Sequence, residues 1–128
     1  MRHYSRGFTL IELLVVVAII GILSAVGVVS YSGYKVSAEK KQAEITLNSI
    51  YLAEQEYKSN NGEYYFNSST SNLVNNLFDG VDDLSEQAFT FSTTNANTLT
   101  ITATKKSDSN CRISITQTNK KPSSTSSC

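Results

Sequence analysis

Glu12 is the residue whose chemistry most needs a partner, because it stands at the start of an apolar run. Residues 13–34 contain no charged side chain, and a carboxylate in such a segment costs about 2.5–3.5 kcal/mol near the centre of a membrane. A cut between Gly7 and Phe8 would give Phe8 a positive α-amino group one helical turn before Glu12. Within one chain that pair would satisfy itself. Between staggered chains, Glu12 would instead neutralise a neighbour's amine and set the register of assembly.

The rest of the sequence offers little for catalysis. His3 is the only histidine, so a chain cut after residue 7 would have none. That excludes a Ser-His or Cys-His nucleophile and any histidine metal ligand. The sequence also shows no metal-ligand spacing and no glycine-rich phosphate loop. We therefore expect a protein that is not an enzyme and holds no cofactor, and a membrane-anchored enzyme is the disfavoured alternative.

A cluster of carboxylates follows the middle of the chain, formed by Asp79, Asp82, Asp83 and Glu86. Calcium takes several oxygen ligands, so the cluster is a candidate calcium site, although its spacing is not that of an EF-hand loop. A solvated turn with a helix cap is the favoured interpretation. Upstream, Asn67-Ser-Ser matches a glycosylation acceptor by three residues only.

Basic residues gather towards the C-terminus, namely Lys105, Lys106, Arg112, Lys120 and Lys121. They are candidates for contacts with DNA phosphates. The only aromatic residues nearby, Phe89 and Phe91, are expected in the core, and the formal net charge of +0 gives no general preference for nucleic acid. Solubilising charge near an exposed edge is therefore the favoured interpretation.

The two cysteines, Cys111 and Cys128, both lie in the C-terminal part of the chain. A pair of cysteines in an exported protein is most simply one disulfide. The loop it would close is short, and the expected stabilisation is roughly 3 kcal/mol. The alternative is two free thiols in a cytoplasmic protein, which the N-terminus argues against.

The N-terminus is that of a membrane-inserted chain. Arg2 and Arg6 precede an uncharged stretch that is long enough to cross a bilayer as a helix. The positive-inside rule leaves residues 1–7 in the cytoplasm and places the chain beyond residue 34 outside it. An ordinary signal peptide would be cut after the apolar stretch, and Ser24-Ala25 offers small residues for this. The apolar run continues past that point, which disfavours an ordinary signal peptide.

The segment Gly7-Phe8-Thr9-Leu10-Ile11-Glu12, ahead of this apolar run, resembles the class III signal of type IV pilins and pseudopilins. The resemblance covers roughly residues 5–34 closely and extends more loosely beyond them. It implies that prepilin peptidase cuts after Gly7, that Phe8 becomes an N-methylated mature N-terminus, and that Glu12 guides entry into a filament. It also implies that an inner-membrane pilus assembly machinery handles the chain. Val29 stands where many family members have proline, a residue that kinks a helix, so we expect a straighter helix here than is usual in the family.

A long helix should follow, from about residue 8 to residue 60, which is roughly 80 Å at 1.5 Å per residue. Beyond residue 34 its pattern becomes amphipathic. The expected core stripe, widened by Tyr51 and Leu52, consists of Val36, Ala43, Leu47, Ile50 and Tyr57. The remaining surface is expected to carry Lys40, Lys41, Glu44, Glu54 and Glu56. Asn60-Asn61-Gly62 should end the helix.

Three strands are predicted at residues 89–93, 98–104 and 112–116, where apolar and hydroxyl residues alternate. Turns are expected at residues 95–97 and 107–110, and a short helix at residues 73–78. The predicted inward face consists of Phe89, Phe91, Leu99, Ile101, Ile113 and Ile115. The tail at residues 120–127 has the composition of a mobile linker. The fold class is therefore α+β and pilin-like, with one long helix packed on an antiparallel sheet of three or four strands.

Three segments are expected: a cleaved leader at residues 1–7, a transmembrane and filament-core helix half at 8–34, and a globular head at 35–128. The expected function is a structural subunit of a type IV pilus-like surface filament, a homo-oligomer held by its apolar helices. The chain would sit in the inner membrane before assembly and outside the cell afterwards. The alternatives are a type II secretion pseudopilin and a DNA-binding minor pilin.

Overall fold

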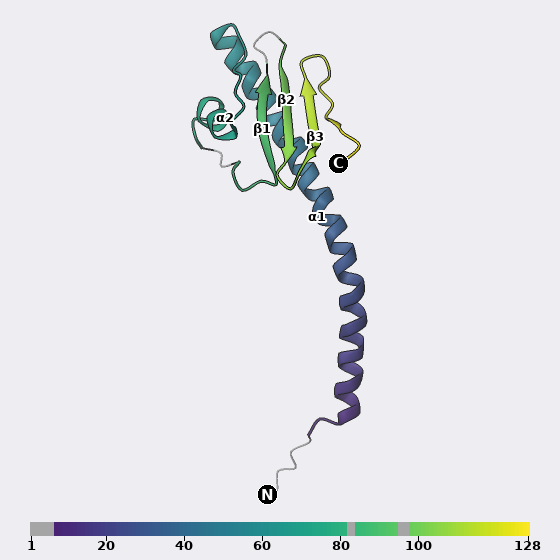
Figure 1. Ribbon diagram of the computed structural model, residues 1–128. Helices are drawn as coiled ribbons and strands as arrows, with labels where there is room; N and C mark the ends of the chain where they lie inside the picture. The colour runs from purple at the N-terminus through teal and green to yellow at the C-terminus, as the bar shows by residue number, and fades with distance from the viewer. Residues whose placement is uncertain (1–6, 82–83, 95–97) are drawn as a thin grey trace, which may run out of the picture. The chain divides into compact units, whose positions relative to one another are not determined.

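The computed structural model describes residues 7–81, 84–94 and 98–128. Its elements are two helices, α1 (Leu10–Asn61) and α2 (Thr70–Leu77), followed by four strands: β1 (Phe89–Thr94), β2 (Thr100–Lys105), β3 (Asp108–Thr116) and β4 (Ser123–Ser124) (Figure 1). The chain divides into two compact units, Met1–Val36 and Ser37–Cys128. The expected α+β, pilin-like class is confirmed.

In the first unit, the start of α1 is a helix without a core. No proline interrupts it, and the chain stays helical through residue 29. Large apolar side chains along this part are exposed, including Leu13, Ile19, Ile22 and Leu23. Apolar surface on this scale needs lipid or neighbouring chains to cover it.

In the second unit, α1 contributes one buried stripe. Ala43, Leu47 and Ile50 are at most 1 % exposed, as the periodicity predicts. The prediction is wrong for Leu52, which is 67 % exposed. At about 100° per residue, Leu52 points to the side of the helix opposite Ile50. Tyr57 is only half-buried, and Val36, 47 % exposed, falls in the first unit.

Glu54 is the second departure from the expected helix faces. We expected it on the solvated side with the other charged residues, but it is completely buried. It follows Leu47 by seven residues and Ile50 by four, which is the spacing of the core stripe itself. Its position therefore obeys the helical period, and only its charge suggested exposure.

The sheet is antiparallel throughout, in the order β1-β2-β3-β4. Its register aligns Phe91 with Ala103, and Ala103 with Ile113. The inward face predicted from the alternation is confirmed, because all six of its members are buried: Phe89, Phe91, Leu99, Ile101, Ile113 and Ile115. In Figure 1 the strands lie in front of α1, so that the other face of the sheet turns toward the viewer.

Two predictions in the C-terminal part are wrong. Residues 108–110, expected in a turn, begin β3, and the turn is confined to Lys106 and Ser107. The tail, expected to be mobile, forms β4, in which Ser123 pairs with Ser114 of β3. The Thr125 amide also donates to the Arg112 carbonyl oxygen at 2.9 Å.

The short helix expected at residues 73–78 is α2, and it begins three residues earlier. The turn expected at residues 95–97 lies outside the described residues.

Both outer edges of the sheet are occupied by the chain itself. Along β1, the Phe91 amide donates to Thr70 Oγ1 at 2.8 Å, and the Thr93 amide donates to the Asn67 carbonyl oxygen at 2.9 Å. Along β3, β4 takes the edge position. The segment before α2 and the C-terminal segment thus satisfy backbone groups that an open edge would expose.

Candidate functional site

Thr9 and Glu12 form a reciprocal cap at the start of α1. Glu12 Oε2 accepts hydrogen bonds from the Thr9 amide at 2.9 Å and from Thr9 Oγ1 at 2.7 Å. The Glu12 amide donates to Thr9 Oγ1 at 3.3 Å. This is a capping box, in which the two residues satisfy backbone donors left free by the helix end. Glu12 therefore has a local structural role that the sequence reasoning missed, although the Thr-x-x-Glu spacing signals it.

The surroundings of Glu12 are apolar and open. A shallow hollow of about 370 Å³ is lined by Phe8, Ile11, Glu12, Val15 and Val16. Phe8 is 87 % exposed and directly precedes the capped turn. Among the described residues, α1 is the one helix that is long and apolar enough to cross a membrane. The carboxylate thus lies where an apolar neighbour, lipid or protein, would cover the helix.

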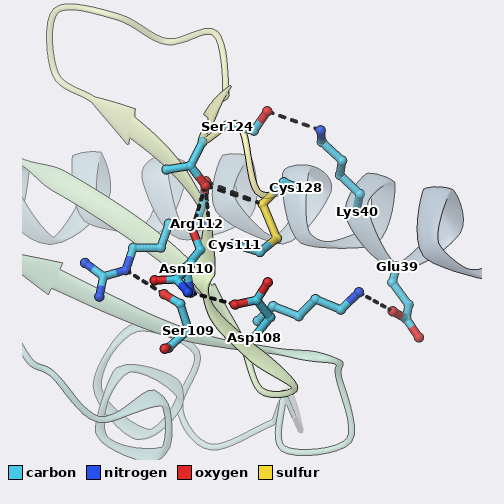
Figure 2. The surroundings of a disulfide bond; sticks show 11 residues. Glu39, Lys40, Asp108, Ser109, Asn110, Cys111, Arg112, Ser124 and Cys128 are labelled. Atoms are coloured by element: carbon cyan, nitrogen blue, oxygen red, sulfur yellow. Dashed lines mark hydrogen bonds and ion pairs between the residues drawn. A yellow bond between two sulfur atoms is a disulfide. The ribbon is translucent and has the colours of Figure 1, made fainter.

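The disulfide between Cys111 and Cys128 is present, with a Cα–Cα distance of 4.7 Å, and the prediction is confirmed. It joins β3 to the last residue of the chain (Figure 2). Thr125 supports the same junction, because its hydroxyl donates to the Asn110 carbonyl oxygen at 2.7 Å. From α1, Lys40 Nζ donates to Ser124 Oγ at 3.1 Å. The C-terminal segment is therefore fixed to both the sheet and the helix.

The basic residues proposed for DNA are not brought together as a patch. Lys105 pairs with Glu39 of α1 at 3.4 Å, and Lys106 Nζ donates to the Ser85 carbonyl oxygen. Lys120 Nζ lies 5.8 Å from the centre of the Tyr51 ring. Arg112 lies on the opposite face of the sheet from the Lys105–Glu39 pair, and Lys121 is exposed on the tail.

The carboxylate cluster proposed for calcium lies partly outside the described residues, because Asp82 and Asp83 are not among them. Asp79 follows α2 with a left-handed backbone, φ 51°, and Glu86 is exposed. Within residues 7–81, 84–94 and 98–128, no group of three or more His, Cys, Asp or Glu side chains is arranged to hold a metal ion. Asn67, the candidate glycosylation residue, uses Oδ1 to accept a hydrogen bond from the Ser69 amide at 2.8 Å.

Glu54 is a second residue that the sequence reasoning missed. Its Oε2 accepts a hydrogen bond from the Tyr65 amide at 2.9 Å, but Oε1 has no partner among the described residues. Burial raises the pKa of this carboxyl to about 7, and the Tyr65 hydrogen bond offsets the shift only in part.

Comparison with known proteins identifies the N-terminal segment. Residues 2–28 match the family model described as the prokaryotic N-terminal methylation motif. A "Fimbrial protein" of Neisseria meningitidis serogroup A is 36% identical over 74 residues, 58% of this chain and 44% of the relative. The "Type IV major pilin protein PilA" of Myxococcus xanthus is 38% identical over 60 residues, 47% of this chain and 27% of the relative. The "Type IV major fimbrial protein FimA" of Dichelobacter nodosus is 36% identical over 81 residues, 58% of this chain and 49% of the relative.

The class defined by these features is a pilin-like chain, with a long N-terminal helix and an antiparallel four-stranded sheet. The motif, the relatives and the fold together support the assignment of the chain to the type IV pilin family. The relatives named above are pilins or fimbrial proteins by description, and none is described as an enzyme. The chain spans less than half the length of each of these three relatives.

Proposed function

We propose that this chain is a structural subunit of a type IV pilus, polymerised through the apolar N-terminal part of α1. The observation that carries the proposal is that the methylation motif, residues 2–28, runs into a helix whose large apolar side chains between residues 10 and 28 are exposed. Such a surface is stable only against lipid or against other apolar helices. The membrane before assembly and a bundle of identical helices afterwards would each cover it.

Processing is the first part of the proposal. Residues 1–7 would be a leader that prepilin peptidase removes between Gly7 and Phe8, after which the new N-terminus is methylated. Gly7 and Phe8 both precede α1, whose first residue is Leu10. An extended segment of this kind is accessible to a peptidase, whereas a bond inside a helix is not. The unit from residue 8 to 34 would form the filament core, and residues 35–128 the head.

Assembly is the second part. Cleavage would create a cationic amine at Phe8, next to the Thr9 amide that already donates to Glu12. The capping box uses one carboxylate oxygen, Oε2, and leaves Oε1 without a hydrogen bond from the described residues. Oε1 would be available to a neighbour's Phe8 amine as the subunit enters the filament. Pairing the two charges removes the cost of an isolated carboxylate in apolar surroundings.

The N-terminus of the mature protein tests the proposal. Mass spectrometry of the chain purified from its natural host should show a start at methylated Phe8. The inner membrane and the external filament should both contain this processed form, because cleavage precedes assembly. A chain that begins at Met1, or beyond Ser24, contradicts the pilin function.

The runner-up within the family is a type II secretion pseudopilin, which forms a filament confined to the periplasm. The disulfide-closed C-terminal segment favours the pilus modestly. Labelled filaments that appear outside the cell would support the pilus, and a pool restricted to the periplasm would support the pseudopilin. A DNA-binding minor pilin is less favoured, because Lys105 and Lys106 have partners within the head.

A further inference from the structure

The solvent face of the sheet carries hydroxyl side chains in ordered rows. The cross-strand register places Thr102 between Ser92 of β1 and Ser114 of β3, and Ser114 in turn pairs with Ser123 of β4. A second row aligns Thr100 with Thr94 and Thr116. Neighbouring strands are about 4.8 Å apart and alternate residues along a strand about 6.8 Å apart. The register therefore builds a grid of hydroxyls on one face of the sheet.

Several of these hydroxyls are unused within the molecule. Among the described residues, Thr102, Ser114 and Ser123 make no side-chain hydrogen bond, whereas Thr90 Oγ1 donates to the Thr104 carbonyl oxygen at 3.2 Å. A hydroxyl can both donate and accept a hydrogen bond. The centre of the grid thus offers both functions to a ligand.

Arg112 adds one positive charge to this face. It pairs with Thr104 across β2 and β3, in the row next to that of Thr102. Its Nε donates to the Ser109 carbonyl oxygen at 3.1 Å, as Figure 2 shows, which fixes the guanidinium. No ion pair of Arg112 with a carboxylate exists among the described residues. Its two terminal amino groups therefore remain for an oxyanion, the geometry that a guanidinium binds best.

A shallow hollow of about 270 Å³ joins the cation to the hydroxyls. It is lined only by hydroxyl residues and the arginine: Thr100, Thr102, Arg112, Ser114, Ser123, Ser124 and Thr125. No carboxylate and no apolar side chain lines it. A ligand for this site should therefore present hydroxyl groups together with an anionic group.

We propose that this face binds an acidic polysaccharide, with Arg112 on a carboxylate of the sugar chain and Thr102, Ser114 and Ser123 on its hydroxyls. A nucleic acid fits less well, because it needs several cations along its phosphates and aromatic side chains for its bases. The lining of the hollow has one cation and no aromatic residue. The inference concerns the head alone, and stands or falls independently of whether the chain assembles into a pilus.

The test uses the full chain in detergent micelles and two matched polymers, polygalacturonate and its methyl ester, in which a methyl group replaces the charge of each carboxylate. Each polymer is immobilised, and binding is followed by biolayer interferometry. The chain should bind polygalacturonate and bind the ester at least about tenfold more weakly, the usual effect of one charge-assisted hydrogen-bonded pair. Binding should fall only gently with added salt, since a single ion pair is involved.

Arg112→Gln should weaken binding to polygalacturonate by about tenfold or more and leave the weak binding to the ester unchanged. Thr102→Val keeps the shape of the side chain and removes its hydroxyl, and should weaken binding to both polymers by about threefold to tenfold. Lys121→Gln removes one charge from the tail and is the matched control, with binding within about twofold of the parent. Thermal unfolding checks that the globular head of each variant is still folded.

Equal binding of the two polymers, or full binding by Arg112→Gln, would overturn the proposal. So would no detectable binding of polygalacturonate by the parent chain. Double-stranded DNA provides the third probe: tighter binding of DNA, with a steep loss as salt is added, would assign the face to nucleic acid instead.

Discussion

Glu54 and Tyr65 are joined by a single hydrogen bond, from the Tyr65 amide to Glu54 Oε2 at 2.9 Å, inside a core that leaves Oε1 without a partner among the described residues. The bond connects the last turns of α1 to the segment that leads into α2. An ionised carboxylate buried with one hydrogen bond is unfavourable, whereas the protonated acid fits such a site. The head therefore holds a carboxyl that prefers to be neutral.

This preference predicts that the head is less stable at alkaline pH. The pKa of Glu54 is raised from 4.5 to about 7 in the folded chain. Between those values the unfolded chain releases the proton and the folded chain keeps it, so the free energy of unfolding falls as pH rises. The free energy of unfolding should be about 3 kcal/mol lower at pH 8 than at acidic pH. Below pH 4.5, where Glu54 is protonated in both states, Glu54 should cause no loss. Near-UV circular dichroism of thermal unfolding, between pH 4 and pH 8, measures it.

Glu54→Gln should remove most of that pH dependence and stabilise the head at pH 8, because a neutral amide keeps the acceptor for the Tyr65 amide. Glu56→Gln, an exposed carboxyl two residues along, is the control and should leave the dependence in place. Unfolding that is equally pH-dependent in Glu54→Gln would show that other groups cause it.

A second prediction concerns the core stripe of α1. Leu47 is 0% exposed, and Leu47→Ala should lower the free energy of unfolding of the head by about 2–5 kcal/mol through lost contacts and a cavity. Ile45 is 67 % exposed, and Ile45→Ala should change it by less than about 0.5 kcal/mol. Chemical denaturation of the two variants in the same detergent compares them. Equal losses would mean that the helix packs on the sheet through a different face.

The disulfide provides a third prediction. Cys111 and Cys128 are 17 residues apart, and their joint replacement by serine should lower the stability of the head by about 3 kcal/mol. The Thr125 amide, which donates to the Arg112 carbonyl oxygen, should then exchange its hydrogen much faster than in the parent chain. The Leu73 amide of α2 donates to Ser69 and is the internal reference, expected to change only with the global loss. Unchanged exchange at Thr125 would show that β4 needs no covalent tie.

The fourth prediction separates the two roles given to Glu12. Glu12→Val removes both the cap and the charge, whereas Thr9→Val removes the hydroxyl of the cap and keeps the charge. If Glu12 pairs with a neighbour's amine, Glu12→Val should be inserted and cleaved normally but form no filaments. Thr9→Val should still form them, with a helix start weakened by about 1 kcal/mol. Immunoblots of the membrane and sheared filament fractions make the comparison.

Glu12→Gln completes this series, because the amide can still accept the Thr9 hydrogen bonds but carries no charge. Filaments from Glu12→Gln in normal amounts would contradict charge pairing and leave the capping box as the function of this residue. Loss of filaments in all three variants would point to the helix start rather than to the charge.

The alternation of apolar and hydroxyl residues was sufficient to predict the inward face of β1, β2 and β3, but not β4. Phe91, Ile101 and Ile113 lie inward as expected because a period of two leaves a strand only two faces. The capping box between Thr9 and Glu12 was not predicted, although the Thr-x-x-Glu spacing signals it, because the charge of Glu12 alone was considered. Glu12 can both cap its own helix and pair with a neighbour's amine, and its spacing from Thr9 does not show which role matters more.

Long-range contacts explain what could not be predicted. The tail has the composition of a linker, but a disulfide, Lys40 and the Thr125 hydrogen bonds hold it against β3. Glu54 was predicted on the surface because of its charge. The hydrogen bond that it accepts from the Tyr65 amide, eleven residues away, is a contact that the helical pattern does not reveal. The basic residues cluster in sequence, but strand alternation and the turn at residues 106–107 send them in different directions.

The closed edges of the sheet have a consequence for how copies of this chain can meet. Asn67 and Thr70 occupy the β1 edge, and the outermost strand on the other side, β4, is only two residues long. Neither border offers a long open row of amides and carbonyls on which another strand could grow. Crowding many heads side by side therefore carries little danger of fusing them into a continuous, amyloid-like sheet. Contacts between heads must rely on side chains, which sequence change can retune without disturbing the backbone.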